Sequence, residues 1–188
     1  MKVLLGVTGS VAAVLTPKIV KSLLALDFTV TVVATESSLY FWQPTAVDVP
    51  VYLEEDEWPG LQYEKDSSIG HIELREWADL MLIAPITANT LAKMANGFCD
   101  NLLTSIVRAW DRQKPIIIAP AMNTVMWTHP ATEQHIRQLQ QWYDLSVIQP
   151  QSKILACGDE GPGALADIKD IVSAVKTKQL IGGGNGTG

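Results

Sequence analysis

The sequence predicts an α/β fold built on a single doubly wound parallel sheet. Short runs of β-branched and apolar residues recur along the chain, helical patterns separate them, and 188 residues suffice for one domain with a sizeable core. Because these runs are apolar throughout and do not alternate with polar residues, helices must cover both faces of the sheet. The expected architecture is therefore a three-layer sandwich of the flavodoxin/Rossmann-like kind.

The first predicted unit is a strand, a tight turn and a helix. Residues 2–8 are typical of a buried strand, Gly9 and Ser10 of a turn, and residues 11–26 of a helix. Pro17 lies inside this helix, where it either introduces a kink or marks a restart capped by Thr16.

Four further strands are predicted at residues 28–34, 80–84, 115–119 and 145–148. Residues 47–70 are acidic and carry turn residues, so we expect a surface excursion there. The folded domain is expected to span residues 1–181, and the glycine-rich residues 182–188 to form a flexible tail.

Composition narrows the class of protein. Nearly half of the residues are hydrophobic (47%), which excludes a disordered chain, and a net charge of -6 without a basic run argues against nucleic acid as a partner. The apolar N-terminal stretch is too short for a signal peptide or a membrane span. Cys99 and Cys157 form neither a disulfide framework nor a metal-ligand spacing, so we expect a cytoplasmic protein without a metal.

Two strand ends carry small polar residues that suit a ligand. Gly9 and Ser10 could bind an anion at a helix start, although their sequence is not a dinucleotide or P-loop motif, and a plain connection explains it equally well. After the second strand, Glu36 could contact a ribose and Ser37 a terminal phosphate. The alternative is that Ser37 or Ser38 only caps the next helix.

Two later strand ends raise the same choice. Asn89 could pair with a heterocycle or a ribityl hydroxyl, whereas Thr87 could be no more than a helix N-cap. Asn123, Met126 and Trp127 follow the fourth strand and exceed what a turn requires, yet the last two could be ordinary core residues.

Histidine and cysteine supply the reactive groups. His71 stands alone, which is more often structural than catalytic, while His129 and His135 have the setting of surface residues. Cys157 lies in a glycine-rich loop and could act as an acid or a nucleophile, whereas Cys99 has the setting of a small buried hydrophobe. The residues themselves thus indicate an α/β nucleotide-type binder, with His71, Asn123 and Cys157 as candidate polar groups.

Three segments resemble motifs of one flavoenzyme family. PITANT (85–90) resembles its PASANT motif, PAMNTVMW (120–127) its PxMNxxMW motif, and LACGDEGPGALAD (155–167) its substrate-recognition clamp. Together with HIELREWAD (71–79), they are similar to the phosphopantothenoylcysteine decarboxylase family of flavin-containing cysteine decarboxylases, in its single-domain plant and animal form. The likeness runs from residue 3 to about residue 167.

The resemblance implies FMN-dependent oxidative decarboxylation of phosphopantothenoylcysteine, followed by reduction of the enethiol to phosphopantetheine for coenzyme A. It also implies a homotrimer with sites at subunit boundaries, with no membrane or nucleic acid as partner. The roles that it assigns are catalytic for His71 and Cys157, substrate-binding for Asn123, Met126 and Ala156, and FMN-binding for Gly9, Ser10, Val11, Ser37, Thr87, Ala88, Asn89, Thr90 and Ala121.

One position departs from the family, and two other functions compete. Relatives are expected to carry a second arginine after Arg75, where this chain has Glu76; Lys153 could compensate for the lost positive charge. One competing function is a non-catalytic, halotolerance-type regulator of a protein phosphatase. The other is a different flavoenzyme of the superfamily, such as a peptidyl-cysteine decarboxylase or a flavin prenyltransferase.

Overall fold

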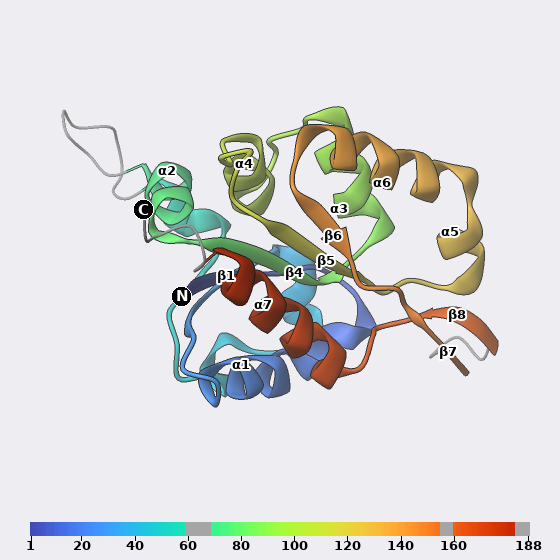
Figure 1. The fold of residues 1–188 in the computed structure, drawn as a ribbon, viewed down its shortest axis with the longest axis horizontal. Coiled ribbons are helices and arrows are strands. Elements are labelled where there is room, and N and C mark those ends of the chain that lie inside the picture. Colours follow the sequence, from blue (N-terminus) through green and yellow to red (C-terminus); the bar gives the residue numbers. More distant parts are fainter. Residues whose placement is uncertain (59–68, 155–159, 183–188) are drawn as a thin grey trace.

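A computed structural model of the chain describes residues 1–58, 69–154 and 160–182. Its centre is a six-stranded parallel sheet in the order β3-β2-β1-β4-β5-β6, as Figure 1 shows. The strand order reverses between β1 and β4, which confirms the doubly wound fold. The strands are β1 (Lys2–Val7), β2 (Thr29–Ala34), β3 (Val51–Tyr52), β4 (Leu80–Ile86), β5 (Ile116–Pro120) and β6 (Leu145–Val147).

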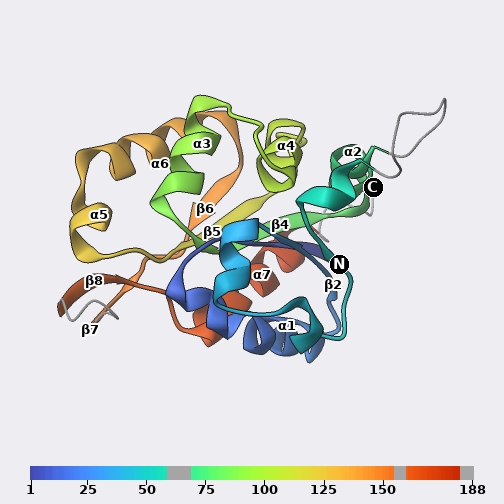
Figure 2. The ribbon, with the colours of Figure 1, turned by 180° about the vertical axis from the view of Figure 1, so that it is seen from behind.

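Helices cover both faces of this sheet (Figures 1 and 2). Successive side chains of β1 point to opposite faces, so Leu5 joins one core and Leu4 the other. The Leu5 core receives α1 (Thr16–Leu24) and α7 (Ile168–Gly182). The Leu4 core receives α2 (Gly70–Trp77), α3 (Ala88–Asn96), α4 (Leu102–Arg108) and α6 (Pro130–Trp142).

The helix predicted at residues 11–26 is two helices. The 3-10 helix η1 (Val11–Leu15) precedes α1, and Pro17 lies in the first turn of α1, where a missing N–H breaks no helical bond. The predicted restart is confirmed, but the cap is wrong. Leu15 occupies the N-cap position, and the buried Thr16 hydroxyl has no hydrogen-bond partner among the described residues.

The acidic excursion predicted at residues 47–70 is partly built into the sheet. β3 pairs with β2 through Val32 and Val51, and the 3-10 helix η4 (Glu54–Glu57) follows. Two more 3-10 helices, η2 (Glu36–Tyr40) and η3 (Pro44–Ala46), connect β2 to β3. Residues 59–68 lie outside the described part of the chain. Therefore a two-residue edge strand was missed inside a segment that we interpreted as surface loop.

A small antiparallel hairpin stands apart from the main sheet. β7 (Gln151–Ile154) pairs with β8 (Glu160–Ala164), and β8 lies beside the short helix α5 (Thr124–Thr128). This hairpin replaces the plain loop expected before residue 164. The predicted domain limits and tail remain predictions, since α7 ends at Gly182 and residues 183–188 are not described. None of the described helices is long and apolar enough to cross a membrane.

Candidate functional site

The carboxyl ends of β1, β2, β4 and β5 meet at one edge of the sheet, on both sides of the strand-order reversal. Thr35 N donates to Val7 O at 3.0 Å, and Ala121 N donates to Ile86 O at 3.1 Å. These bonds hold the four loops that follow the strands next to one another. Open α/β sheets bind ligands at such a point. We refer to the meeting place of the four loops that follow β1, β2, β4 and β5 as the crevice. The predicted FMN-binding residues all lie in these four loops or in the first turn of the helix that follows them.

Thr8 ties two of these loops together. Its buried hydroxyl donates to Pro85 O at 2.9 Å and accepts from Thr87 N at 2.9 Å. Its backbone N–H also donates to Pro85 O, at 3.2 Å. Thr8 was not predicted as a site residue. The feature that could have indicated it is a hydroxyl residue at the end of an otherwise apolar strand.

Gly9 packs directly against the loop after β2. A Cβ atom at Gly9 would lie 2.5 Å from Ser37 Oγ and 3.0 Å from Ser37 O, so only glycine fits there without a shift. Ser37 Oγ lies 3.1 Å from Thr35 Oγ1, and the Ser37 side chain stays exposed. Neither predicted serine caps the helix, because Thr35 occupies the N-cap position and the Ser38 hydroxyl donates to Thr35 O.

The 3-10 helix η1, which follows β1, begins with a polar N-cap residue followed by an exposed apolar side chain. Ser10 is the N-cap residue of η1, and its hydroxyl accepts from Ala12 N at 3.4 Å. Val11 follows with half of its surface exposed. Ser10 and Val11 thus lie at the start of η1, directly after β1, and their FMN contacts remain a prediction.

The start of α3 presents backbone donors to the same edge. Thr87 Oγ1 accepts from Thr90 N at 3.3 Å, which confirms the capping interpretation of Thr87. The N–H groups of Ala88 and Asn89 precede the first intrahelical bond, from Leu91 N to Thr87 O. The Asn89 side chain is exposed, so its amide is accessible to a ligand that binds this helix N-terminus.

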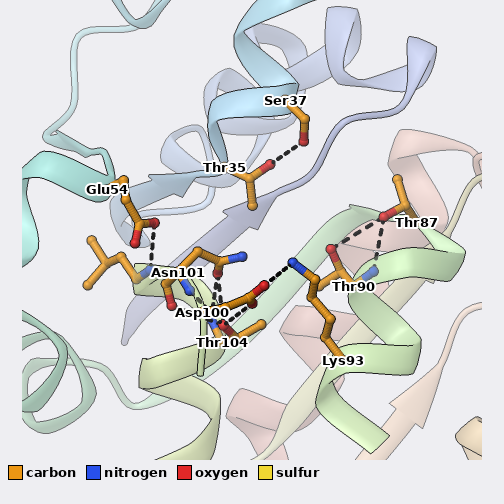
Figure 3. A network of polar contacts seen from close by, with 10 residues as sticks. Thr35, Ser37, Glu54, Thr87, Thr90, Lys93, Asp100, Asn101 and Thr104 are labelled. Carbon is orange, nitrogen blue, oxygen red and sulfur yellow. Dashed lines mark hydrogen bonds and ion pairs between the residues drawn. The ribbon is translucent and has the colours of Figure 1, made fainter. Parts of the chain in front are cut away.

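A network of polar contacts joins the end of α3 to the start of α4 through Lys93, Asp100, Asn101 and Thr104 (Figure 3). These contacts were not predicted from the sequence. Lys93 donates to Asp100, and this hydrogen bond lowers the pKa of the Asp100 carboxyl. Asn101 and Thr104 cap α4 reciprocally. Cys99 lies in the loop between the two helices and is exposed, so its prediction as a buried helical residue was wrong.

Asn123 begins α5 and has one side of its amide already engaged. Its Oδ1 accepts from Met126 N at 2.8 Å, which leaves the Nδ2 donors for a ligand. An amide that is held in this way offers N–H groups to an anion. Met126 is 46% exposed, so the interpretation of Met126 as a core residue was wrong; Trp127 is half-buried.

The β7–β8 hairpin docks on the start of α5 through glycines. Met122 N donates to Gly163 O at 3.0 Å, and a Cβ atom at Gly163 would lie 2.2 Å from Met122 O. A Cβ atom at Gly161 would lie 2.7 Å from Thr124 Oγ1. The hairpin strands therefore lie in backbone contact with the segment that carries Asn123. Ala156, predicted to bind substrate, and Cys157, predicted to be catalytic, lie outside the described ranges.

His71 lies at the opposite end of the sheet. It belongs to the first turn of α2, which leads into the amino end of β4, whereas α5 lies beyond the carboxyl ends (Figure 1). His71 Nδ1 is 2.9 Å from Glu57 Oε1. The fold of one chain therefore does not bring His71 to its own Asn123.

The other predicted charged and histidine positions are peripheral. Glu76 is exposed and 3.7 Å from the Arg75 guanidinium, which also donates to Ala109 O. Lys153 pairs with Asp167 at 3.5 Å. His129 is exposed and caps α6, whereas His135 is half-buried. No group of three potential metal ligands occurs among the described residues.

Comparison with known proteins identifies the class to which this fold and crevice belong. The model of the Flavoprotein family matches residues 1–180. The chain belongs to the Flavoprotein family. It is 49% identical over 176 residues to phosphopantothenoylcysteine decarboxylase of Mus musculus, an overlap that covers 93% of this chain and 85% of the mouse protein.

Two solved structures share the fold closely. A cysteine-to-serine mutant of PPC decarboxylase, complexed with pantothenoylaminoethenethiol, matches with a TM-score of 0.90 and 44% identity over 95% of this chain and 98% of its own. The FMN binding protein AtHal3 matches with a TM-score of 0.85 and 45% identity over 94% of this chain and 95% of its own. These matches confirm the resemblance first drawn from the three motifs.

Proposed function

We propose that this chain is an FMN-dependent phosphopantothenoylcysteine decarboxylase that forms phosphopantetheine in coenzyme A biosynthesis. The observation that carries the proposal is the convergence of the loops that follow β1, β2 and β4 at the point where the strand order reverses. There Gly9, Ser37 and the start of α3 converge, next to the segment that carries Asn123. Relatives with this activity in their names match nearly the whole chain.

The crevice residues fit FMN in kind and in number. Gly9 leaves no side chain between the first two loops, and the exposed Ser37 hydroxyl suits a phosphate oxygen. The first turn of α3 offers N–H groups and the Asn89 amide to a heterocycle, and the buried Ala121 presents only a methyl group. The remaining predicted contacts are Ser10, Val11, Thr87, Ala88 and Thr90.

Bound FMN supplies a reversible two-electron oxidation, and the protein supplies orientation and protons. The free Nδ2 donors of Asn123 hold the substrate carboxylate until carbon dioxide departs. Met126, which is exposed beside Asn123, and Ala156 complete the substrate contacts. His71 assists the oxidation, and Cys157 protonates the enethiol when it is reduced.

The proposed role of His71 calls for a second chain, because the fold does not bring His71 to the Asn123 of its own chain. A subunit that places its α2 end at a neighbour's crevice joins two different surfaces, and such a head-to-tail contact forms a ring when the rotation between subunits closes. Both surfaces carry exposed apolar side chains: Val11 (50%) and Val125 (68%) near the crevice, Trp58 (63%) and Ile69 (39%) near His71. We therefore assign a homotrimer with each site at a subunit boundary, acting in the cytoplasm on a small-molecule substrate.

Release of carbon dioxide from phosphopantothenoylcysteine tests the reaction directly. Flavin-loaded protein is expected to release it and to form phosphopantetheine. The Cys157→Ser variant is expected to release carbon dioxide but to accumulate the oxidised enethiol, because the last protonation lacks its acid. If the loaded wild-type protein releases none, the decarboxylase function is wrong, and a binding protein such as a phosphatase regulator becomes the function to pursue.

Subunit mixing tests the shared site. His71→Asn and Asn123→Ala homomers are each expected to be inactive. Co-refolding the two should restore part of the activity, because some boundaries then join an intact His71 to an intact Asn123. Mixing His71→Asn with more His71→Asn is the matched control. A mixture as inactive as its components would place both residues of a working site in one chain.

A further inference from the structure

One buried acid lies against the predicted catalytic histidine. Glu57 is only 5% exposed, and its Oε1 lies 2.9 Å from His71 Nδ1. The two atoms are at ion-pair distance but do not meet the geometry of a hydrogen bond. Nδ1 has no other polar partner among the described residues. A buried carboxylate is stable only when it is paired, so this contact compensates for the burial of Glu57.

The backbone is shaped to bring the two side chains together. A Cβ atom at Gly70 would lie 3.1 Å from Asp56 O and 3.2 Å from Glu57 Cα. These distances are tighter than ordinary van der Waals contact, so the first turn of α2 lies on the backbone of η4 because residue 70 is glycine. This close packing of the two backbones brings the side chains of Glu57 and His71 together.

Trp58 closes one side of the imidazole. The two rings meet edge to face, with 6.1 Å between their centroids and an interplanar angle of 79°. With Glu57 at Nδ1 and Trp58 in edge-to-face contact, the imidazole is packed on two sides, and 22% of the His71 side chain remains exposed. Nε2 has no hydrogen-bond partner among the described residues, so it is the ring nitrogen that we expect a substrate to contact.

We infer that Glu57 is the positioning residue of His71, which it holds as the Nδ1–H tautomer with an unprotonated Nε2. A carboxylate at one imidazole nitrogen selects the tautomer and stabilises the imidazolium that forms when the other nitrogen accepts a proton. The inference rests on the proposed function. Nε2 would accept the proton as the substrate S–H bond breaks, and bound FMN would supply the two-electron oxidation by accepting the hydride of the adjacent carbon.

Glu57→Gln separates this role from a purely structural one, because it keeps the size of the side chain and removes its charge. Loss of such a partner typically costs about 10–100-fold, so we expect kcat to fall by about that factor, with KM and FMN affinity within about twofold. Glu57→Asp, which restores the charge, should recover part of kcat. The matched control is Glu55→Gln, an exposed acid of the same 3-10 helix, which should leave kcat unchanged.

Imidazole ¹⁵N shifts of the FMN-loaded protein supply a readout that needs no substrate. The His71 signals are assigned by their absence in His71→Asn, since the chain has three histidines. The wild type and Glu57→Asp should show the Nδ1–H tautomer, and Glu57→Gln a shift toward Nε2–H. An unchanged tautomer in Glu57→Gln, or a kcat equal to that of Glu55→Gln, overturns the inference. A wild type without turnover but with the expected tautomer contradicts the proposed function and leaves the pairing intact.

Discussion

The two ends of the sheet carry different kinds of residue. At the carboxyl end, the loops contain close glycine contacts, hydroxyl groups and helix N-termini. Gly9 packs against Ser37, whereas Thr87 and Asn123 cap the helices that follow them. At the amino end, a buried carboxylate, an imidazole and an exposed tryptophan meet across two segments. The first end is suited to holding a ligand, and the second to moving a proton. Substitutions in the loops proposed to hold FMN should therefore affect binding, whereas those that displace groups proposed to act on the substrate should affect turnover.

The largest effect is expected where the hairpin docks on the carboxyl end. Gly163→Ala would place a Cβ atom 2.2 Å from Met122 O, a contact between backbone atoms that no side-chain rotation relieves. The hairpin must move, and a displacement of about 1 Å at a site can cost about 10²-fold in rate. We expect kcat for carbon dioxide and phosphopantetheine formation to fall by about that factor, with FMN affinity unchanged.

Ser152→Ala, on the exposed side of the same hairpin, is the control for this prediction and should retain full turnover. Wild-type turnover in Gly163→Ala would show that the docking contact is not needed. Loss of FMN from Gly163→Ala would show that the hairpin supports the crevice itself, and the division between holding and acting would be wrong.

An effect of comparable or smaller size is expected at Gly9, on binding alone. A Cβ atom there overlaps Ser37, and overpacking costs about 1–3 kcal/mol. If the loops separate to relieve it, the FMN dissociation constant should rise by about 5–150-fold, measured by flavin fluorescence quenching.

Gly6→Ala provides the comparison for Gly9→Ala, since its Cβ atom would lie 2.8 Å from a Leu103 methyl in the core. It should lower Tm and leave the FMN dissociation constant unchanged. Equal effects of the two variants on FMN binding would mean that the crevice responds to general loosening of the fold.

A moderate loss of stability is expected from Asn101→Ala. The substitution removes the N-cap of α4, which costs about 1 kcal/mol and lowers Tm by about 2–4 °C in a domain of this size. Thermal unfolding monitored by circular dichroism measures it. Because the capping contact lies away from His71 and Asn123, kcat at 25 °C should be unchanged; a matching drop in kcat would connect the network of Figure 3 to turnover.

The smallest effect is expected from the Lys93–Asp100 pair. Its hydrogen bond holds the pKa of Asp100 below the ordinary value of 3.8, so the stabilisation exists above that pH and is lost as the pH falls through the lowered value. The carboxylate is largely exposed, so Asp100→Asn should reduce the free energy of unfolding by only about 0.2–1 kcal/mol at pH 7. Urea titrations at pH 7 and below pH 3.8 should show this difference shrinking with acid.

The sheet and crevice could be predicted because their signals are local. Unbroken apolar runs marked β1, β2, β4 and β5, and the polar residues that cap the next helices follow those runs directly. Cys99 was misplaced although its signal was also local: Gly97, with φ 73°, ends α3 before the cysteine.

The elements that we did not predict depend on contacts between residues that are far apart in the sequence, or are too short to show a pattern. β8 reads EGPGA, a composition unfavourable for a strand, and it is held by pairing with β7 and by docking on α5. The two-residue β3 is too short to show a period. The Glu57–His71 contact crosses from one segment to another, and only the close packing at Gly70 reveals it.

The Thr8 hydroxyl has a consequence for how a ligand enters. It is bonded to Pro85 O near the end of β4 and to Thr87 N in the loop that follows, so the spacing between the ends of β1 and β4 is set before anything binds. Association should then follow a single exponential phase whose rate rises linearly with flavin concentration, without a slow closing step. The same rigidity should make the loops around Thr8 exchange their amide hydrogens slowly even in flavin-free protein.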